Sequence, residues 1–186
     1  MNELEQVVIN EEHADERELI ISQLMDEYSD GILHLVFTYV KNRTTAEDLT
    51  QEIFIKCYEK LDQFKNKASI KTWAYRIAIN HCKDYLRSWH YRKIIFNEKI
   101  YDYIPSKSKQ VEEEIIEKNE ETCLTNAVIS LPLKYREVVF LHYYEELSLV
   151  EINKVTNINI NTIKTRLKRA KELLKDTMTE EVLIDD

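Results

Sequence analysis

The chain has 186 residues, a formal net charge of −8, one glycine (Gly31) and two prolines (Pro105 and Pro132). So few helix-breaking residues predict an all-α protein, and they exclude glycine-rich phosphate loops, which need glycine where the backbone approaches the phosphate. No apolar run approaches the roughly 20 residues of a membrane span, and the acidic N-terminus does not resemble a signal peptide. We therefore expect a cytoplasmic protein with no direct membrane insertion.

The cysteines and histidines indicate no bound group. Cys57, Cys82 and Cys123 are odd in number and far apart, and the five histidines form no paired pattern with them. We therefore expect no metal site and no cofactor. Cys57 and Cys82 lie on the inner faces of predicted helices, where a free cysteine behaves as a small apolar residue.

The charge is unevenly distributed along the chain. Residues 1–62 carry −10, 63–93 carry +7, 94–160 carry −5, 161–175 carry +5 and 176–186 carry −5. Such a protein should bind nucleic acid poorly by itself, because its overall field repels phosphate. It should bind well when a larger partner presents both basic segments together.

The first third of the chain predicts helices with an acidic outer face. Residues 1–17 are acidic without apolar periodicity, so we expect a mobile tail. Residues 18–40 predict one helix, or a bent pair around Asp30 and Gly31. A second helix follows, which Thr44 or Thr45 could cap. Its outer face carries Asp48, Gln51, Glu52, Ile55 and Glu59. An apolar residue on this face hints at a protein contact, although most acidic faces only keep a protein soluble.

The segment 63–93 is basic and rich in aromatic residues, a combination that suits a nucleic-acid backbone and its unstacked bases. A polar loop at 65–70 precedes an amphipathic helix. The buried face of this helix is predicted to hold Ala74, Tyr75, Ala78, Ile79, His81, Cys82, Tyr85 and Leu86. The opposite stripe holds Trp73, Arg76, Asn80, Lys83 and Arg87. The segment taken alone leaves open that this stripe is only a solvated face.

A flexible linker at 94–123 is predicted to join two small helical domains, 18–93 and 124–178, with an acidic tail at 179–186. The second domain ends in a short helix, a tight turn and a long basic helix, which is a helix-turn-helix. Asn157 tolerates the left-handed conformation that this turn needs, and Asn161 is a good N-cap. In the long helix Lys164, Thr165, Lys168 and Arg169 project away from the apolar face, as groove-reading side chains do. A merely soluble face is the less favoured alternative.

Four ordered blocks resemble bacterial RNA polymerase sigma factors of the extracytoplasmic-function (ECF) group, in the sigma-70 family. The blocks are AEDLTQEIF, FKNKASIKTWAYRIAINHCKDYLR, LPLKYREVVFLHYYEELSLVEI and NTIKTRLKRAKELL, within residues 18–175. The resemblance implies a non-enzymatic protein that binds core RNA polymerase and directs it to promoter DNA. It also implies a membrane-anchored anti-sigma factor as partner, which would hold the protein at the membrane.

The resemblance assigns roles to individual residues, with 18–93 as sigma region 2 and 124–178 as sigma region 4. Polymerase binding would fall to Asp48, Gln51, Glu52 and Ile55. The minus-ten element would be held by Lys65, Asn66, Lys67, Ser69, Trp73, Arg76, Asn80, Lys83 and Arg87. The minus-thirty-five element would be read by Asn161, Lys164, Thr165, Lys168 and Arg169.

The chain departs from the family pattern at several positions. Asn153 stands where alanine is usual, Asn157 and Asn161 where glycine is usual, and Ile70 where an aromatic residue is common. The amide of Asn153 would need a partner among the packed helices. One alternative is a stand-alone helix-turn-helix regulator of duplex DNA, which leaves the acidic block and the basic aromatic helix unexplained. A nucleic-acid-processing enzyme would need a catalytic cluster, and the sequence suggests none.

Overall fold

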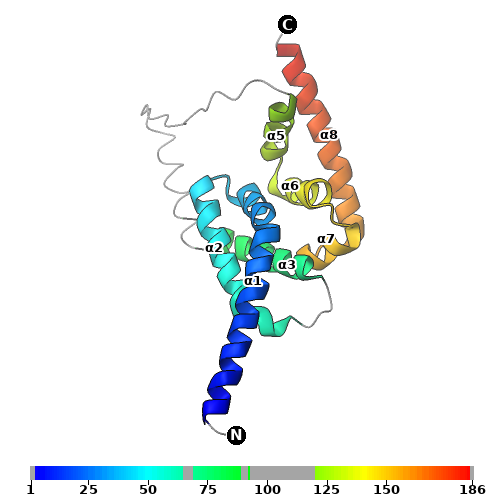
Figure 1. Ribbon diagram of the computed structural model, residues 1–186. Coiled ribbons are helices and arrows are strands. Elements are labelled where there is room, and N and C mark those ends of the chain that lie inside the picture. The colour runs from blue at the N-terminus through cyan, green and yellow to red at the C-terminus, as the bar shows by residue number, and fades with distance from the viewer. Residues whose placement is uncertain (1–2, 65–68, 89–91, 93–119, 185–186) are drawn as a thin grey trace.

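The computed structural model describes the backbone of residues 3–64, 69–88, 92 and 120–184, and the side chains of residues 17–64, 69–88, 92 and 124–178. These ranges are helical and contain no β-strand, so the all-α prediction is confirmed. Figure 1 shows two helical units. The N-terminal unit contains α1 (Glu3–Val40), α2 (Arg43–Lys60), the 3-10 turn η1 (Leu61–Gln63) and α3 (Ile70–Arg87). The C-terminal unit contains α5 (Glu120–Ser130), α6 (Leu133–Val139), the π-helical turn η2 (Phe140–Tyr144), α7 (Leu149–Thr156) and α8 (Ile160–Ile184).

The first and last helices, α1 and α8, are longer than the apolar patterns predict. α1 begins at Glu3 and passes through Gly31 as one helix, so residues 3–17, expected as a tail, are helical. α8 likewise continues to Ile184. Once a helix is nucleated, each further residue adds a hydrogen bond without needing an apolar partner. Residues 94–119 of the expected linker lie outside the described residues. Residues 120–123, the end of the expected linker, belong to α5.

The core of the N-terminal unit follows the predicted apolar faces. α1 packs on α2 and α3, and α2 packs on α3. The buried positions on α1 and α2 include Leu24, Ile32, Leu35, Val36, Tyr39, Leu49, Ile53 and Cys57. On α3 the buried positions are Thr72, Ala74, Tyr75, Ala78, Ile79, His81 and Cys82, with Tyr85 and Leu86 half-buried. Each large aliphatic side chain withdrawn from water in this way contributes about 1.5–3 kcal/mol to stability.

Short polar side chains begin the helices of this unit. Asn42 caps α2, because its side chain accepts a hydrogen bond from the backbone N–H of Thr45 at 2.9 Å. The expectation that Thr44 or Thr45 is the cap is therefore wrong. Asn42 has the extended backbone (φ −135°, ψ 124°) that aims a capping side chain at the first turn. Ser69 caps α3 in the same way, through the N–H of Thr72 at 3.2 Å.

The predicted helix-turn-helix is confirmed as α7, a short turn and α8. Asn157 ends α7 in the left-handed conformation (φ 60°, ψ 28°), as its residue type predicts. α8 begins at Ile160, and the Asn159 side chain accepts from the N–H of Asn161 at 2.9 Å. Asn159, rather than Asn161, is thus the capping side chain of the second helix.

Two further contacts hold this motif together. Ser148 and Glu151 form a capping box at the start of α7, with each side chain bonded to the other residue's backbone N–H. The amide of Asn153 donates to the carbonyl of Ile158 at 2.8 Å. The asparagine that replaces a small residue therefore has its partner in the turn, where it ties α7 to the segment leading into α8.

The two units pack against each other. α3 contacts α7, and α1 contacts α6 and η2 (Figure 1). The buried apolar residues of both units form one continuous cluster. This arrangement is not predicted by the sequence patterns, which describe each unit separately.

Candidate nucleic-acid interface

The outward stripe of α3 is partly open to solvent and partly covered. Arg76, Asn80 and Arg87 are exposed, and Trp73 is half-buried with its ring centroid 5.3 Å from that of Phe64. Lys83 instead points to the C-terminal unit, where its Nζ lies 2.9 Å from Oε1 of Glu137. The part of the stripe that remains exposed presents two guanidinium groups and an amide, which suit a phosphate backbone and base edges.

The loop before α3 is only partly described. Lys65, Asn66 and Lys67 lie outside the described residues. Ser69 is exposed at the start of α3, where its hydroxyl also lies 2.8 Å from that of Thr72. Its position beside the exposed stripe is consistent with the predicted strand-contacting surface, and its capping bond gives it a structural role as well.

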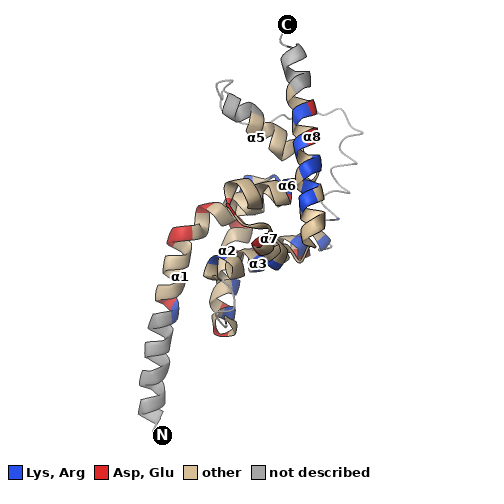
Figure 2. Cartoon of the chain, turned by 90° about the vertical axis from the view of Figure 1, so that its right-hand side faces the viewer, with Lys and Arg blue, Asp and Glu red and all other residues tan. Residues whose placement is uncertain are grey.

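α8 carries a row of cations on its outer face. Asn161, Lys164, Thr165, Lys168 and Arg169 are all exposed. Figure 2 shows Lys and Arg positions, in blue, at successive turns of this helix. The Thr165 hydroxyl donates to the backbone carbonyl of Asn161 at 2.9 Å, and Arg169 pairs with Glu172 at 2.8 Å. Both Arg169 and Glu172 are half-exposed, so a DNA phosphate or base could compete for this guanidinium at small cost.

Not every cation of the basic helix faces outward. Arg166 points back into the unit, with its guanidinium 3.8 Å from Oε2 of Glu137. Lys171 lies over the ring of Tyr143, with its Nζ 5.5 Å from the centroid. The number of charges in the helix does not separate Arg166 from the exposed cations, whereas the 100° step of the helix places Arg166 next to the buried face.

The acidic outer face of α2 is a separate exposed surface. Asp48, Gln51, Glu52 and Ile55 are all exposed, and Ile55 retains 59% of its accessible area. Ile55 is one of several exposed large apolar side chains of the described residues, and a single one of this kind is common on a protein surface. A groove between α2 and α3 adjoins this face, lined in part by Asp48, Glu52, Lys56, His81 and Asp84.

His81 links the floor of this groove to the acidic face, a contact that the sequence patterns miss. Its Nδ1 lies 2.7 Å from Nζ of Lys56, and its Nε2 lies 2.9 Å from Oε2 of Glu52. An ammonium can only donate, so Nδ1 accepts and the Nε2–H donates to Glu52. Burial and the neighbouring Lys56 lower the pKa of His81, which keeps the ring neutral. The spacing of Glu52 and Lys56 places both on one face of α2, but only the packing of α3 inserts a histidine between them.

The described residues contain neither a cluster of metal-binding side chains nor a membrane-spanning helix. No group of three or more His, Cys, Asp or Glu side chains there could hold a metal ion. None of the helices in the described ranges is both long and apolar enough to span a bilayer. Cys57 and Cys82 are free and buried, as predicted. Burial raises the pKa of each thiol to about 12, so both are protonated at neutral pH.

A basic helix-turn-helix and a second helical unit with its own cationic stripe are features of a DNA-binding protein. Models of two protein families match the chain: "Sigma-70 region 2" at residues 24–91 and "Sigma-70, region 4" at residues 121–174. RNA polymerase sigma factor SigV of Bacillus subtilis (strain 168) is 33% identical over 165 residues, covering 89% of this chain and 94% of the relative. ECF RNA polymerase sigma factor SigW of the same strain is 31% identical over 166 residues, covering 86% and 89%. The chain belongs to the ECF RNA polymerase sigma factors, as the four sequence blocks predict.

Solved structures share the fold. The sigma factor RpoE in complex with the anti-sigma factor NepR, from Bartonella quintana, matches with a TM-score of 0.66 at 20% identity, covering 85% of this chain and 96% of that chain. CnrH in complex with the cytosolic domain of CnrY matches with a TM-score of 0.62 at 17% identity, covering 88% and 90%. These likenesses confirm the two-unit helical architecture.

Proposed function

We propose that this sigma factor binds core RNA polymerase through the outer face of α2 and positions it on promoters through α3 and α8. The observation that carries the proposal is the exposure of three separate surfaces, one acidic and two basic, on a chain with a net charge of −8. An acidic chain repels DNA at long range, so its basic surfaces act best when polymerase holds them beside the promoter. Two modest DNA contacts then act together at high effective concentration.

On α2, Asp48, Gln51, Glu52 and Ile55 would form the polymerase contact. Carboxylates set around an exposed aliphatic side chain suit a partner with basic residues around an apolar spot. His81 donates a hydrogen bond to Glu52 and so restricts the rotamers that this carboxylate can adopt. A side chain held in place before binding loses less entropy on association.

At the minus-ten element, α3 and the loop before it would hold one DNA strand. Arg76 and Arg87 would contact phosphates, while Trp73, Asn80 and the loop residues Lys65, Asn66, Lys67 and Ser69 would lie beside unstacked bases. Lys83 would join this surface once it is released from Glu137. Trapping a base outside the stack offsets the few kcal/mol that unstacking costs at a melting step. This role requires no covalent chemistry of the chain.

At the minus-thirty-five element, α8 would enter the major groove. Lys164, Lys168 and Arg169 would reach guanine acceptors or phosphates, and Thr165 and Asn161 would contact base edges or the backbone. The helix-turn-helix orients α8 for this role, since the second helix of that motif is the one that lies in the groove.

Regulation by an anti-sigma factor is the remaining part of the proposal. The sigma factor RpoE, which shares this fold, is in complex with the anti-sigma factor NepR, and CnrH of the same fold is in complex with the cytosolic domain of CnrY. We infer that a comparable partner, anchored in the membrane, holds this chain inactive in the cytoplasm at the membrane surface. Co-purification of the chain from its host with and without detergent extraction tests this step, and recovery of only a soluble partner would contradict the anchoring.

Run-off transcription tests the central proposal. Purified core polymerase is given a promoter library with and without this protein, and discrete start sites sharing two spaced elements should occur only when it is present. The double variant K168A/R169A should lose dependence on the upstream element, while K60A, which changes an exposed lysine on α2, should transcribe as the parent does. If no initiation occurs and the chain binds duplex DNA alone, it is a stand-alone regulator instead.

A further inference from the structure

We propose that the free chain holds itself closed through two carboxylates of the C-terminal unit, Glu137 and Glu145, which bind cations and hydroxyls of the N-terminal unit. The closed arrangement withholds Lys83 from DNA, so the units must separate before α3 is fully available. The inference rests on the proposed function at one point only, the assignment of Lys83 to the minus-ten surface. The closure itself is independent of what the protein binds.

Glu137 reaches two different helices of the N-terminal unit. Its side chain is only 5% exposed, and its Oε1 accepts hydrogen bonds from the Tyr39 hydroxyl at 2.5 Å and from Nζ of Lys83 at 2.9 Å. Arg166 of its own unit lies near the other oxygen. Burial and the nearby Glu137 raise the pKa of Tyr39 well above its usual range, so the hydroxyl stays protonated and donates. A carboxylate can be buried in this way only when its oxygens are paired, so the contact is a specific one.

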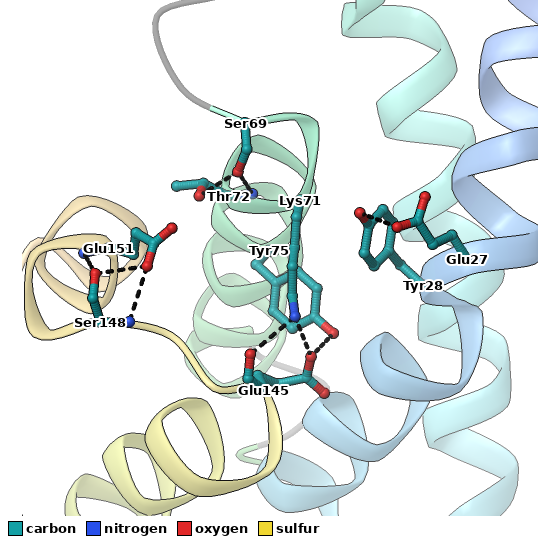
Figure 3. Close-up of polar contacts among 9 residues, drawn as sticks. All are labelled: Glu27, Tyr28, Ser69, Lys71, Thr72, Tyr75, Glu145, Ser148 and Glu151. Atoms are coloured by element: carbon teal, nitrogen blue, oxygen red, sulfur yellow. Dashed lines mark hydrogen bonds and ion pairs between the residues drawn. The ribbon is translucent and has the colours of Figure 1, made fainter.

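Glu145 makes the second contact, where it lies between α1 and α3 (Figure 3). Its Oε2 accepts from the Tyr75 hydroxyl at 2.5 Å and pairs with Nζ of Lys71 at 3.2 Å. The same Nζ donates to the backbone carbonyl of Glu145 at 2.9 Å, so the ammonium binds both the carboxylate and the backbone of this residue. Lys71 also lies over the rings of Tyr28 and Tyr75, at 5.9 Å and 5.6 Å from their centroids. Together these groups form a preorganised receptor for one carboxylate.

A third contact comes from Arg136, which is buried at 3% exposure. Its Nε donates to the carbonyl of Thr38 at 2.7 Å, in the last turn of α1. Carbonyls in the last turn of a helix have no partner within the helix and carry partial negative charge. The Arg136 guanidinium therefore supplies, from the other unit, a hydrogen-bond donor for this carbonyl at the end of α1.

Gly31 makes room for the Glu145 contact. It is the only glycine of the chain and lies inside α1, where glycine is a poor helix former. A Cβ at this position would lie 2.3 Å from the Tyr75 hydroxyl oxygen and 2.7 Å from Oε1 of Glu145, both closer than atoms can approach. The glycine inside α1 therefore leaves room for the hydrogen-bonded pair of Tyr75, from its own unit, and Glu145, from the other.

The polar part of the closure is reversible because it consists of ion pairs and hydrogen bonds, whereas the apolar contacts between the units must be offset by the free energy of binding when the chain opens. When polymerase or DNA separates the units, water and new partners can replace each bond that is lost. Competition for Lys83 is the mechanism by which DNA would favour the open chain. The same ammonium cannot pair with Glu137 and with a DNA phosphate at once.

The distance between the units in the free chain tests the proposal. Spin labels are attached to cysteines introduced at the exposed positions Gln23 on α1 and Asp176 on α8, with Cys123 replaced by serine. Cys57 and Cys82 are buried with protonated thiols and should not react. Pulsed electron paramagnetic resonance should give one narrow distance distribution for the parent chain.

Charge reversal at Glu145 supplies the decisive comparison. E145K places an ammonium beside Lys71 and should raise the ratio of open to closed chains by roughly tenfold or more. E146K makes the same charge change at the neighbouring exposed residue and should leave the distribution unchanged. The double variant K71E/E145K restores an ion pair of opposite orientation and should return most chains to the closed state. Equal distributions in the parent and E145K, or a broad one in the parent, would overturn the proposal.

A binding measurement separates this inference from the proposed function. E137Q removes the charge that holds Lys83 and should increase the affinity of the free chain for single-stranded minus-ten DNA several-fold, whereas E146Q should not. If E137Q opens the chain but DNA affinity is unchanged, the DNA role of Lys83 is wrong and the closure stands. If transcription is normal and neither E137Q nor E145K changes the distance, the closure is wrong and the sigma-factor function stands.

Discussion

His81 shows how a single side chain depends on neighbours from another helix. Its two ring nitrogens have different roles, since one accepts from Lys56 and the other donates to Glu52. The pKa of His81 is lowered first by burial and then by the positive charge of Lys56. The unfolded chain therefore takes up this proton near the ordinary value of about 6.5, before the folded chain does. The contribution of His81 to stability is complete above that pH and is lost as the pH falls.

Substitutions of its two neighbours should move the pKa of His81 in opposite directions. K56M removes a nearby positive charge and should raise it, while E52Q removes a nearby negative charge and should lower it. Nuclear magnetic resonance titration of the His81 ring protons measures both shifts. A shift of the same sign in both variants would show that the hydrogen-bond roles are wrongly assigned.

The capping box of α7 offers a second test at the residue scale. S148A removes the hydroxyl that accepts from the N–H of Glu151 and should lower the free energy of unfolding by about 1 kcal/mol. The bonds from Ser148 lower the pKa of Glu151, so their contribution is present above the unfolded-state pKa and is lost as the pH falls through the folded-state value. Urea unfolding at neutral and acidic pH should show the difference shrink in acid. S22A, at an exposed position within α1, should cause no comparable loss.

At the scale of elements, each helix presents one face to the core and another to a partner. On α8 the inner face buries Ile163, Leu167 and Ala170, and the outer face carries the exposed cations. On α2 the inner face is apolar and the outer face is acidic. The two helices are thus alike in their packing and opposite in the charge of the surface that they leave open, which is why we assign them to different partners.

The outer face of α8 should control binding to the minus-thirty-five element. K168A and R169A should each weaken holoenzyme binding to a matched promoter by roughly tenfold. A side chain that contacts only phosphate should reduce affinity evenly across sequences and flatten the salt dependence, whereas one that reads a base should lose specificity at one position. Filter binding at several salt concentrations distinguishes these cases, with K60A as the control. Parent-like affinity for both variants would refute the groove assignment.

The outer face of α2 should control polymerase binding. D48A and Q51A together should weaken association with core polymerase by about tenfold, because truncation of a few central interface residues usually dominates affinity. The exposed control D26A lies on α1 and should bind as the parent does. Fluorescence anisotropy of the labelled chain with core polymerase measures the change. Circular dichroism should show the same helix content in all three proteins, and unchanged binding by the double variant would remove the proposed contact.

At the scale of the whole molecule, one continuous core joins units that lie far apart in sequence. Glycine inside a helix costs about 0.5–1 kcal/mol relative to alanine, and α1 accepts this cost at Gly31, where the closed arrangement leaves no space for a Cβ. Arg136 ties α5, α6 and the end of α1 together by donating to the carbonyls of Ile129, Leu131 and Thr38. Both residues have neighbours in their own unit and in the other unit.

Removal of the Arg136 guanidinium should destabilise the whole closed molecule. R136M keeps much of the apolar stem but leaves buried carbonyls without donors, and should lower the free energy of unfolding by about 3 kcal/mol. R43M changes an arginine whose side chain is 87% exposed, and should have an effect within about 0.5 kcal/mol. Chemical denaturation followed by circular dichroism compares the two. Equal stability of R136M and the parent would show that these carbonyls are satisfied in another way.

The sequence by itself determined the all-helical class, the buried faces of the central helices, the helix-turn-helix and the family, but not the length of α1 and α8. These features depend on local periodicity, on turn residues such as Asn157, and on the order of motif blocks, all of which are contained in short stretches of chain. The helix caps were predicted less well, because Asn42 and Asn159 compete with neighbouring residues that are equally suitable by type. Only the tertiary structure decided the pairing of Lys83 with Glu137, the hydrogen bonds of His81 and the reason for Gly31. Each of these depends on which surfaces meet across long sequence separations, and that is set by the packing of whole helices rather than by any local preference.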